Sequence, residues 1–158
     1  MVPRIGFGFD THALKEGVPF WLGGILIPHT HGAAGHSDGD TLIHALCDAL
    51  FGAAGLRDIG YQFPDTSEEY KGIDSKILLE RTRIMICEKG FRIGNIDATI
   101  VLQSPKLTPF IPEMVRTLAG ILQTDEINIS IKAKTSENLG FLGRGEGVSA
   151  YAVVLLTR

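Results

Sequence analysis

The residues best suited to chemistry in this sequence are histidines and acidic residues near its beginning. All five histidines fall within the first 44 residues: His12, His29, His31, His36 and His44. Asp10 and His12 are two residues apart, so on an extended strand both side chains point to the same side. Asp40, His44 and Asp48 recur at four-residue intervals, which places them in one line along a helix.

Two histidines and a carboxylate are one of the ligand sets with which catalytic zinc keeps a fourth position open. Asp10, His12 and His44 are therefore candidate metal ligands. The alternative interpretation is that Asp10 only ends a strand and that His44 is a polar surface residue.

A second polar group directly precedes the same helix. Ser37 and Asp40 resemble a capping box in which Asp replaces Glu, so Ser37 is the expected N-cap. The amino end of a helix also attracts anions, and His36 beside it would strengthen phosphate binding. His29 and His31 lie among Pro, Thr and Gly, where we expect both to be exposed and without a role.

Later segments carry polar residues that suit either a binding site or ordinary turns. The stretches 58–60 and 63–67 contain the residues that turns use. Lys106 follows a predicted strand and is suited to hold a phosphate, although a lone lysine is usually solvated. The hydroxyls and carboxylate of Lys134–Glu137 suit a nucleotide or Mg²⁺, or a simple turn. Gly143–Gly147 resembles a phosphate loop, but its spacing and the strand after it exclude that function.

The composition is typical of one globular domain spanning residues 1–158. Hydrophobic residues make up 44% and charged residues 21%, which excludes disorder as the default. A net charge of −3 argues against a surface for nucleic acids or membranes. The sequence shows no signal or transit pattern, so we expect a bacterial cytoplasmic protein. Cys47 and Cys87 fall in apolar helical stretches, where we expect them to be buried and unpaired.

Hydrophobic periodicity predicts an α+β fold. The expected strands are 4–10, 20–22, 25–27, 93–102, 127–134 and 148–156, and the expected helices are 41–55, 74–90 and 109–122. Gly23-Gly24 predicts a hairpin between the second and third strands. Residues 28–35 and 56–72 are expected to be loops. The order βααβαββ, with the hairpin inserted after the first strand, predicts a mixed sheet with helices on one face. Oligomerisation is the simplest cover for the other face.

Taken together, several of these stretches resemble the 2-C-methyl-D-erythritol 2,4-cyclodiphosphate synthase family of the non-mevalonate isoprenoid pathway. The resemblance extends over nearly the whole chain, with the motifs in the family's order. The matching motifs are GFDTH at 8–12, HSDGDTLIH at 36–44, DIG at 58–60, FPDT at 63–66, SPK at 104–106 and GFLGRGEG at 140–147.

The resemblance implies a homotrimer with each active site between two subunits. It implies one zinc ion per subunit, bound by Asp10, His12 and His44, with a substrate phosphate in the open position. It further implies that His36 and Thr135 steady the transition state. Glu137 would ligate Mg²⁺ or Mn²⁺ together with the diphosphate.

The resemblance also implies where the substrate binds. The methylerythritol phosphate pocket would be lined by Ser37, Asp58, Ile59, Gly60, Phe63, Pro64, Asp65, Thr66 and Ser67, beside Asp10, His12 and His36. The cytidine diphosphate would be held by Leu102, Gln103, Ser104, Pro105, Lys106, Leu107, Thr108, Ala133, Lys134, Thr135, Ser136 and Glu137, with Phe141 and Arg144 contributing.

The chain departs from the family pattern at two positions. Phe7 stands where the family often has His, which would change the surroundings of the zinc ligands. Lys134 stands where a hydroxyl residue is common. Arg144 is a candidate for binding a regulatory isoprenoid diphosphate along a trimer axis.

The reaction that the resemblance implies is an intramolecular phosphoryl transfer. The 2-phosphate oxygen of 4-diphosphocytidyl-2-C-methyl-D-erythritol 2-phosphate attacks the β-phosphorus, CMP leaves, and a 2,4-cyclodiphosphate forms. The main barrier is the approach of two anionic phosphates, which divalent cations lower. Two alternatives remain open: a zinc phosphohydrolase that uses an activated water, and a trimeric nucleotide-binding or isoprenoid-diphosphate-binding module without turnover.

Overall fold

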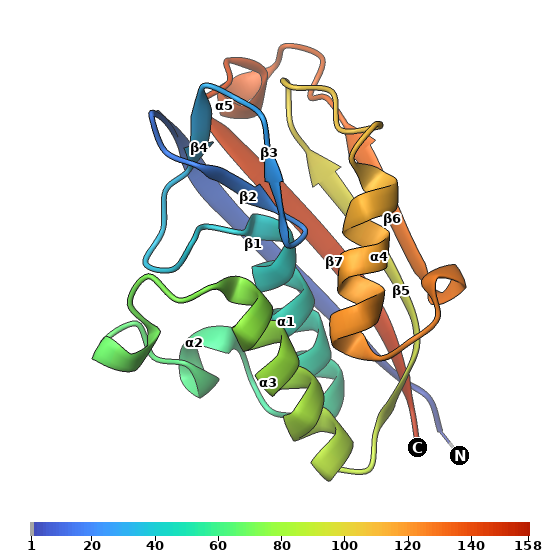
Figure 1. Ribbon diagram of the computed structural model, residues 1–158. Coiled ribbons are helices and arrows are strands. Elements are labelled where there is room, and N and C mark those ends of the chain that lie inside the picture. The colour runs from blue at the N-terminus through green and yellow to red at the C-terminus, as the bar shows by residue number, and fades with distance from the viewer. Residues whose placement is uncertain (1) are drawn as a thin grey trace.

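A five-stranded mixed sheet forms the framework of the computed structural model, which describes residues 2–158 (Figure 1). Its strands are β1 (Arg4–Glu16), β4 (His31–Ala33), β5 (Arg92–Val101), β6 (Ile129–Lys134) and β7 (Gly147–Thr157). A separate hairpin pairs β2 (Phe20–Leu22) with β3 (Ile25–Ile27). The helices are α1 (Thr41–Ala54), α2 (Ile59–Gln62), α3 (Ser75–Glu88), α4 (Ile111–Leu122) and α5 (Gly140–Gly143), with 3₁₀ turns η1 (Glu68–Tyr70) and η2 (Glu126–Asn128).

The strand order is β4-β1-β7-β5-β6, so the C-terminal strand β7 lies at the centre. It runs antiparallel to both β1 and β5, whereas β5 and β6 are parallel and are joined through α4. Helices α1, α3 and α4 all lie on one face of the sheet (Figure 1). The predicted α+β fold, with a mixed sheet and a single helical layer, is confirmed.

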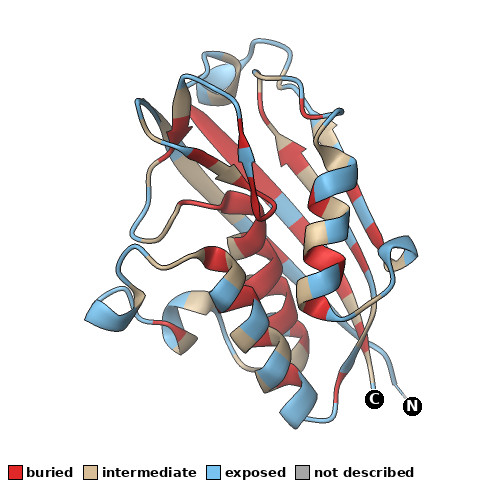
Figure 2. Ribbon diagram, in the orientation of Figure 1, coloured by how far each residue is buried: buried red, intermediate tan, exposed pale blue. Residues whose placement is uncertain are grey.

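Helix α1 packs directly on the backbone of β1, since two glycines leave no side chain between them. A Cβ atom on Gly6 would lie 1.8 Å from the carbonyl oxygen of Ala49, and one on Gly8 would lie 1.9 Å from that of Ala45. The helix is buried on almost all sides (Figure 2). His44 and Asp48 are polar exceptions to its apolar, buried character.

The helix cap differs from the prediction. Asp40, not Ser37, is the N-cap of α1, and its carboxylate accepts a hydrogen bond from the amide of Ile43 at 3.0 Å. The fully buried carboxylate also accepts the amides of Gly23 at 2.9 Å and Gly24 at 2.7 Å. One side chain therefore ties the β2–β3 hairpin to the start of α1, and Ser37 is left available for other contacts.

Three further expectations are wrong. Residues 28–35 are not entirely a loop, because β1 continues to Glu16 and pairs there with the short strand β4. Residues 56–72 contain the helical turns α2 and η1. Cys47 is buried as predicted, but Cys87 is exposed on α3. No helix within residues 2–158 is both long and apolar enough to cross a membrane.

The contact between α1 and β1 leads to a testable prediction about stability. Gly8→Ala should destabilise the fold by about 3 kcal/mol or more, the upper range for overpacking, because the helix backbone cannot be avoided by a rotamer change. Gly120→Ala is the control, since Gly120 lies in α4 with nothing within 4 Å of the added methyl. It should stabilise the chain by about 0.5–1 kcal/mol. Urea unfolding measures both changes, and equal stability of the two variants would contradict this account.

Candidate active site

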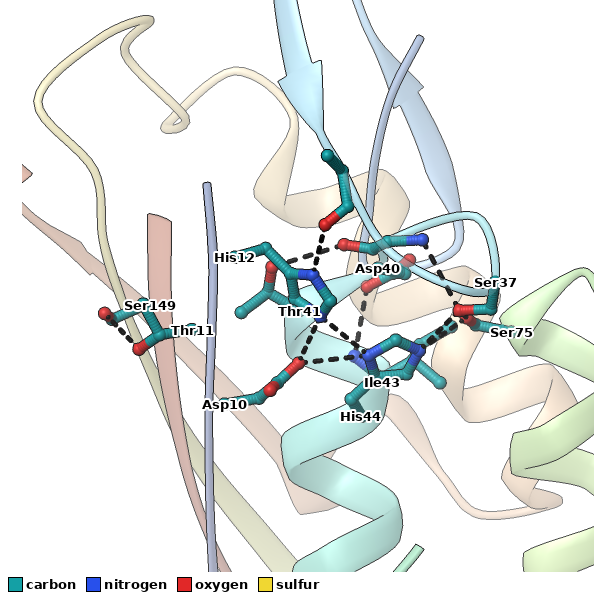
Figure 3. Close-up of polar contacts among 12 residues, drawn as sticks. Asp10, Thr11, His12, Ser37, Asp40, Thr41, Ile43, His44, Ser75 and Ser149 are labelled. Carbon is teal, nitrogen blue, oxygen red and sulfur yellow. Dashed lines mark hydrogen bonds and ion pairs between the residues drawn. The ribbon is translucent and has the colours of Figure 1, made fainter. Parts of the chain in front are cut away.

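Strand β1 and helix α1 bring three candidate ligands together. Asp10 and His12 project from the same face of β1, and His44 projects towards them from the first turn of α1 (Figure 3). Oδ2 of Asp10 lies 2.8 Å from Nε2 of His12 and 3.0 Å from Nδ1 of His44. The two imidazole nitrogens are themselves 3.1 Å apart. Three donor atoms thus converge on one point.

The orientation of His12 is fixed by the loop beyond β4. Its Nδ1 lies 2.7 Å from the carbonyl oxygen of Ala34, so the Nδ1–H donates there and Nε2 faces the cluster. The following residue, Gly35, lets this loop approach closely, because a Cβ there would lie 2.8 Å from the imidazole. A histidine that donates its outer N–H to a carbonyl is the usual arrangement of a metal ligand.

His44 presents its other ring nitrogen, Nδ1, to the cluster. Its Nδ1 faces Asp10 and His12, while Nε2 lies 2.9 Å from the hydroxyl of Ser37 and 3.0 Å from that of Ser75 (Figure 3). Both histidines therefore direct one nitrogen to the cluster and the other to the protein. Together with one carboxylate oxygen they provide the N and O donors that zinc accepts.

The charges in the cluster are strongly coupled. Burial by itself would raise the pKa of Asp10, but hydrogen bonds from His12 and His44 and their charges hold that pKa well below its ordinary value. Burial would lower the pKa of His12, but the hydrogen bond to Asp10 and its charge raise that pKa above the ordinary value. Asp10 is thus ionised and attracts positive charge, either as protons on the histidines or as a metal cation that replaces those protons.

A cavity of about 350 Å³ opens beside the three ligands. Many of the residues expected to bind the methylerythritol phosphate line it: His36, Ser37, Ile59, Gly60, Phe63 and Asp65. At its rim, the side chains of His36 and Asp65 are both exposed, and Nε2 of His36 lies 3.9 Å from Oδ2 of Asp65. Asp58 does not line this cavity, since its carboxylate caps α2 through the amide of Tyr61 at 2.8 Å.

Sequence reasoning missed three residues that also line the cavity: Asp48, Tyr70 and Leu78. Asp48 is half-buried and accepts the amide of Ile59 at 2.7 Å, which anchors the start of α2. Burial raises the pKa of Asp48 above its ordinary value, and the nearby charges of Asp58 and Asp10 add to the rise. The hydrogen bond from the Ile59 amide lowers this pKa but does not cancel the rise. The four-residue spacing from His44 was the signal for Asp48, because it places both side chains on one helix face.

The expected cytidine-binding residues gather elsewhere, at the carboxyl ends of β5 and β6. These strands are parallel, so the segments that follow them are neighbours. The amide of Leu102 donates to the carbonyl of Lys134 at 2.9 Å, and the amide of Asn138 donates to Oε1 of Gln103 at 3.3 Å. The exposed Glu137 accepts a hydrogen bond from the Thr135 hydroxyl at 2.8 Å.

Within residues 2–158, the segments 102–108 and 133–137 contribute no lining to the cavity beside Asp10. Strand β7 separates β5 from β1, so the two groups of expected site residues lie apart in the sheet. Phe141 and Arg144 belong to the α5 segment, where Arg144 pairs with Glu146 at 2.9 Å. A single chain thus assembles the three candidate metal ligands and their cavity but keeps the cytidine-binding candidates separate.

Two other expectations need correction. Phe7 was expected to alter the surroundings of the metal ligands, but its side chain is 63% exposed. It points away from α1, on the opposite face of β1 from Asp10, because neighbouring residues of a strand alternate. His29 is exposed as expected, whereas His31 is half-buried in β4.

Comparison with known proteins gives consistent matches along the chain. Residues 3–157 match the model of the YgbB family. The chain is 60% identical over 153 residues to the 2-C-methyl-D-erythritol 2,4-cyclodiphosphate synthase of Porphyromonas gingivalis, covering 97% of this chain and 94% of that protein.

Solved structures resemble it equally closely. The bifunctional IspDF from Campylobacter jejuni aligns with a TM-score of 0.94 and 44% identity, over 98% of this chain and 42% of that longer chain. A 2C-methyl-D-erythritol-2,4-cyclodiphosphate synthase in its CDP-bound form aligns with a TM-score of 0.90 and 40% identity, over 98% of this chain and 100% of that chain. The chain therefore belongs to the YgbB family, and its resemblance to the 2-C-methyl-D-erythritol 2,4-cyclodiphosphate synthases is confirmed.

Proposed function

We propose that this chain, as one domain over residues 1–158, is a 2-C-methyl-D-erythritol 2,4-cyclodiphosphate synthase, a phosphorus–oxygen lyase that closes a ring. Its substrate is 4-diphosphocytidyl-2-C-methyl-D-erythritol 2-phosphate, and its products are the 2,4-cyclodiphosphate and CMP. The observation that carries the proposal is the convergence of Asp10, His12 and His44 beside a cavity, in a chain 60% identical to a protein of that name.

The three ligands suit zinc. Their donor atoms all lie within 4.8 Å of one another, each histidine has its second nitrogen engaged by the protein, and Asp10 supplies negative charge. When bound, zinc acts as a Lewis acid that neutralises phosphate charge and orients the group.

The chain's own residues perform the remaining tasks. The cavity beside the ligands accommodates the methylerythritol phosphate, with the Ser37 hydroxyl and the Gly60 amide as donors. The exposed His36 at the rim and Thr135 beside Glu137 donate to phosphate oxygens as charge moves towards the leaving CMP. Folding the substrate so that its own phosphates meet supplies proximity, worth up to about 7–11 kcal/mol in favourable cases.

The cytidine diphosphate binds to the segments after β5 and β6. Lys106 is exposed there, and Glu137 provides one carboxylate for Mg²⁺ or Mn²⁺. The hydroxyls of Thr135 and Ser136 donate to Glu137 and to the Leu139 carbonyl in the free chain and would turn from these acceptors to phosphate oxygens. Mg²⁺ typically takes one or two carboxylates plus substrate phosphates, which agrees with a lone exposed glutamate.

The active assembly is a homotrimer in which each site lies between two subunits. Two observations support this. Apolar side chains remain exposed on the sheet face opposite the helices, including Ile5, Phe7, Phe9 and Val153. Such a face is normally covered by a partner. The second is that the metal cluster and the cytidine-binding segments of one chain are separated by β7.

The reaction itself can be tested by phosphorus NMR on purified chain mixed with the cytidyl substrate, zinc and Mg²⁺. We expect a cyclic diphosphate and CMP in equal amounts. Inorganic phosphate or acyclic products would indicate a hydrolase, and an unchanged spectrum with bound substrate would indicate a binding module. His44→Ala should lower turnover by at least about 10²-fold, as for loss of a charge-stabilising group. His29→Ala, which alters an exposed histidine distant from the cavity lining, should retain full activity.

The shared site can be tested by subunit mixing. His44→Ala and Glu137→Ala chains should each be inactive, because each lacks one half of the site. After equal amounts are unfolded and refolded together, about a quarter of the interfaces should carry both intact halves. We expect activity to return to about that fraction of wild type. If mixed oligomers form without any return of activity, the site lies within one chain.

The two cations should behave differently. Zinc, held by three side chains, should survive brief treatment with a mild chelator, whereas the ion at Glu137 should be lost and restored by added Mg²⁺ or Mn²⁺. Glu137→Gln should therefore reduce turnover while leaving bound zinc near one per chain, and Glu126→Gln on the distant η2 turn serves as the control. Zinc content and rate are measured together. A parallel loss of both in Glu137→Gln would show that Glu137 supports the zinc site.

A further inference from the structure

We propose that Ser75, held by Asp38, is a positioning residue that fixes the proton and the direction of the ligand His44. The inference rests on the proposed metal site and adds to it a contribution from α3. Ser75 begins that helix, 31 residues from His44 in the sequence, and it lies outside the residues that the family motifs point to.

Nε2 of His44 has two possible hydrogen-bond partners. Two hydroxyls lie at nearly equal distance, Ser37 at 2.9 Å and Ser75 at 3.0 Å (Figure 3). The surroundings of the two serines differ. Ser75 is fully buried, whereas Ser37 is half-buried and lines the cavity.

Asp38 determines how the Ser75 hydroxyl is used. Its Oδ1 lies 2.5 Å from the Ser75 hydroxyl, and its Oδ2 accepts the Ser75 amide at 2.9 Å. A carboxylate only accepts hydrogen bonds, so the Ser75 O–H donates to Asp38. The hydroxyl oxygen then has only lone pairs left to offer to His44.

The proton on His44 follows from this direction. Nε2 must carry the hydrogen in order to donate to Ser75, so the neutral imidazole has its lone pair on Nδ1. Nδ1 is the nitrogen that faces Asp10 and His12. The chain Asp38–Ser75–His44 therefore prepares the ligand in the tautomer that binds a metal, as second-layer hydrogen bonds commonly do.

Ser37 is free for another use. It has no carboxylate partner among its hydrogen bonds in the described chain, and its hydroxyl lies 3.5 Å from both the Gly39 amide and the Ser75 hydroxyl. Its hydroxyl can rotate towards a phosphate in the cavity without releasing His44, because Ser75 still holds Nε2. The structure thus assigns ligand orientation to Ser75 and leaves Ser37 to the substrate.

Asp38 also connects α3 to α1. The same Oδ1 accepts the amide of Asp40 at 3.1 Å, at the N-cap of α1. One carboxylate therefore connects the start of α1, which carries His44, to the start of α3, which carries Ser75. Displacement of α3 would be transmitted to the imidazole through a single hydroxyl.

The test measures zinc affinity of the full chain by competition with a chromophoric chelator. Ser75→Ala should bind zinc roughly 10–100-fold more weakly, the range for loss of an outer hydrogen-bond partner of a ligand. Ser37→Ala should change zinc affinity by less than roughly threefold, since Ser75 remains. Thr82→Val, which removes another buried α3 hydroxyl that bonds to Leu78, controls for general loss of packing. Thermal unfolding of the metal-free proteins confirms that each variant is folded.

A second measurement needs no variant. Nitrogen-15 NMR of the zinc-loaded wild-type histidines should show His44 with its hydrogen on Nε2 and His12 with its hydrogen on Nδ1. Equal zinc affinity of Ser75→Ala and wild type would overturn the role of Ser75 while leaving the metal site intact. A His44 hydrogen on Nδ1 in the zinc-loaded protein would show that Nδ1 does not bind the metal, and would overturn both the ligand assignment of His44 and the role of Ser75. Failure of the wild type to bind zinc would overturn the metal site itself and this role with it.

Discussion

The contact of α1 with the bare backbone of β1 is the constraint on which the site depends. Gly6 and Gly8 allow the helix carbonyls of Ala49 and Ala45 to reach the strand. Since Asp10 lies two residues beyond Gly8 on the same face, the first turn of α1 then brings His44 within 3.0 Å of its carboxylate. A side chain at either glycine would push α1 away from β1 and would carry His44 away from Asp10 and His12.

Two carboxylates, the buried Asp40 and the half-buried Asp38, fix the surrounding loops relative to that contact. Asp40 gathers the hairpin amides and the first turn of α1, and Asp38 joins the starts of α1 and α3. Each accepts several N–H or O–H donors, which offsets the cost of burying negative charge. Asp40 lies in line with His44 on the helix, but its role is structural. Burial raises the pKa of the Asp40 carboxyl, and hydrogen bonds from Ile43, Gly24 and Gly23 oppose that rise.

The separation of the two groups of site residues has a topological cause. β5 and β6 are parallel, so the segments that follow them meet at one end, while β7 lies between them and β1. The chain therefore presents three candidate metal ligands beside a cavity in one place and a hydroxyl- and carboxylate-rich edge in another. Under the proposed function, an assembly that covers the exposed apolar face around Phe7 and Phe9 brings these two groups of residues together.

Local periodicity in the sequence was enough to predict the α+β class, the hairpin at Gly23-Gly24, and the shared strand face of Asp10 and His12. These follow from strand and helix spacing, which are short-range rules. The motifs were enough to identify the family. Tertiary structure alone decided that Asp40 rather than Ser37 caps α1, that His44 meets Asp10 and His12, that Cys87 is exposed, and that Ser75 reaches His44. Each of these depends on which segments of the chain pack together, or on which face of an element becomes buried, and neither spacing nor propensity encodes that choice.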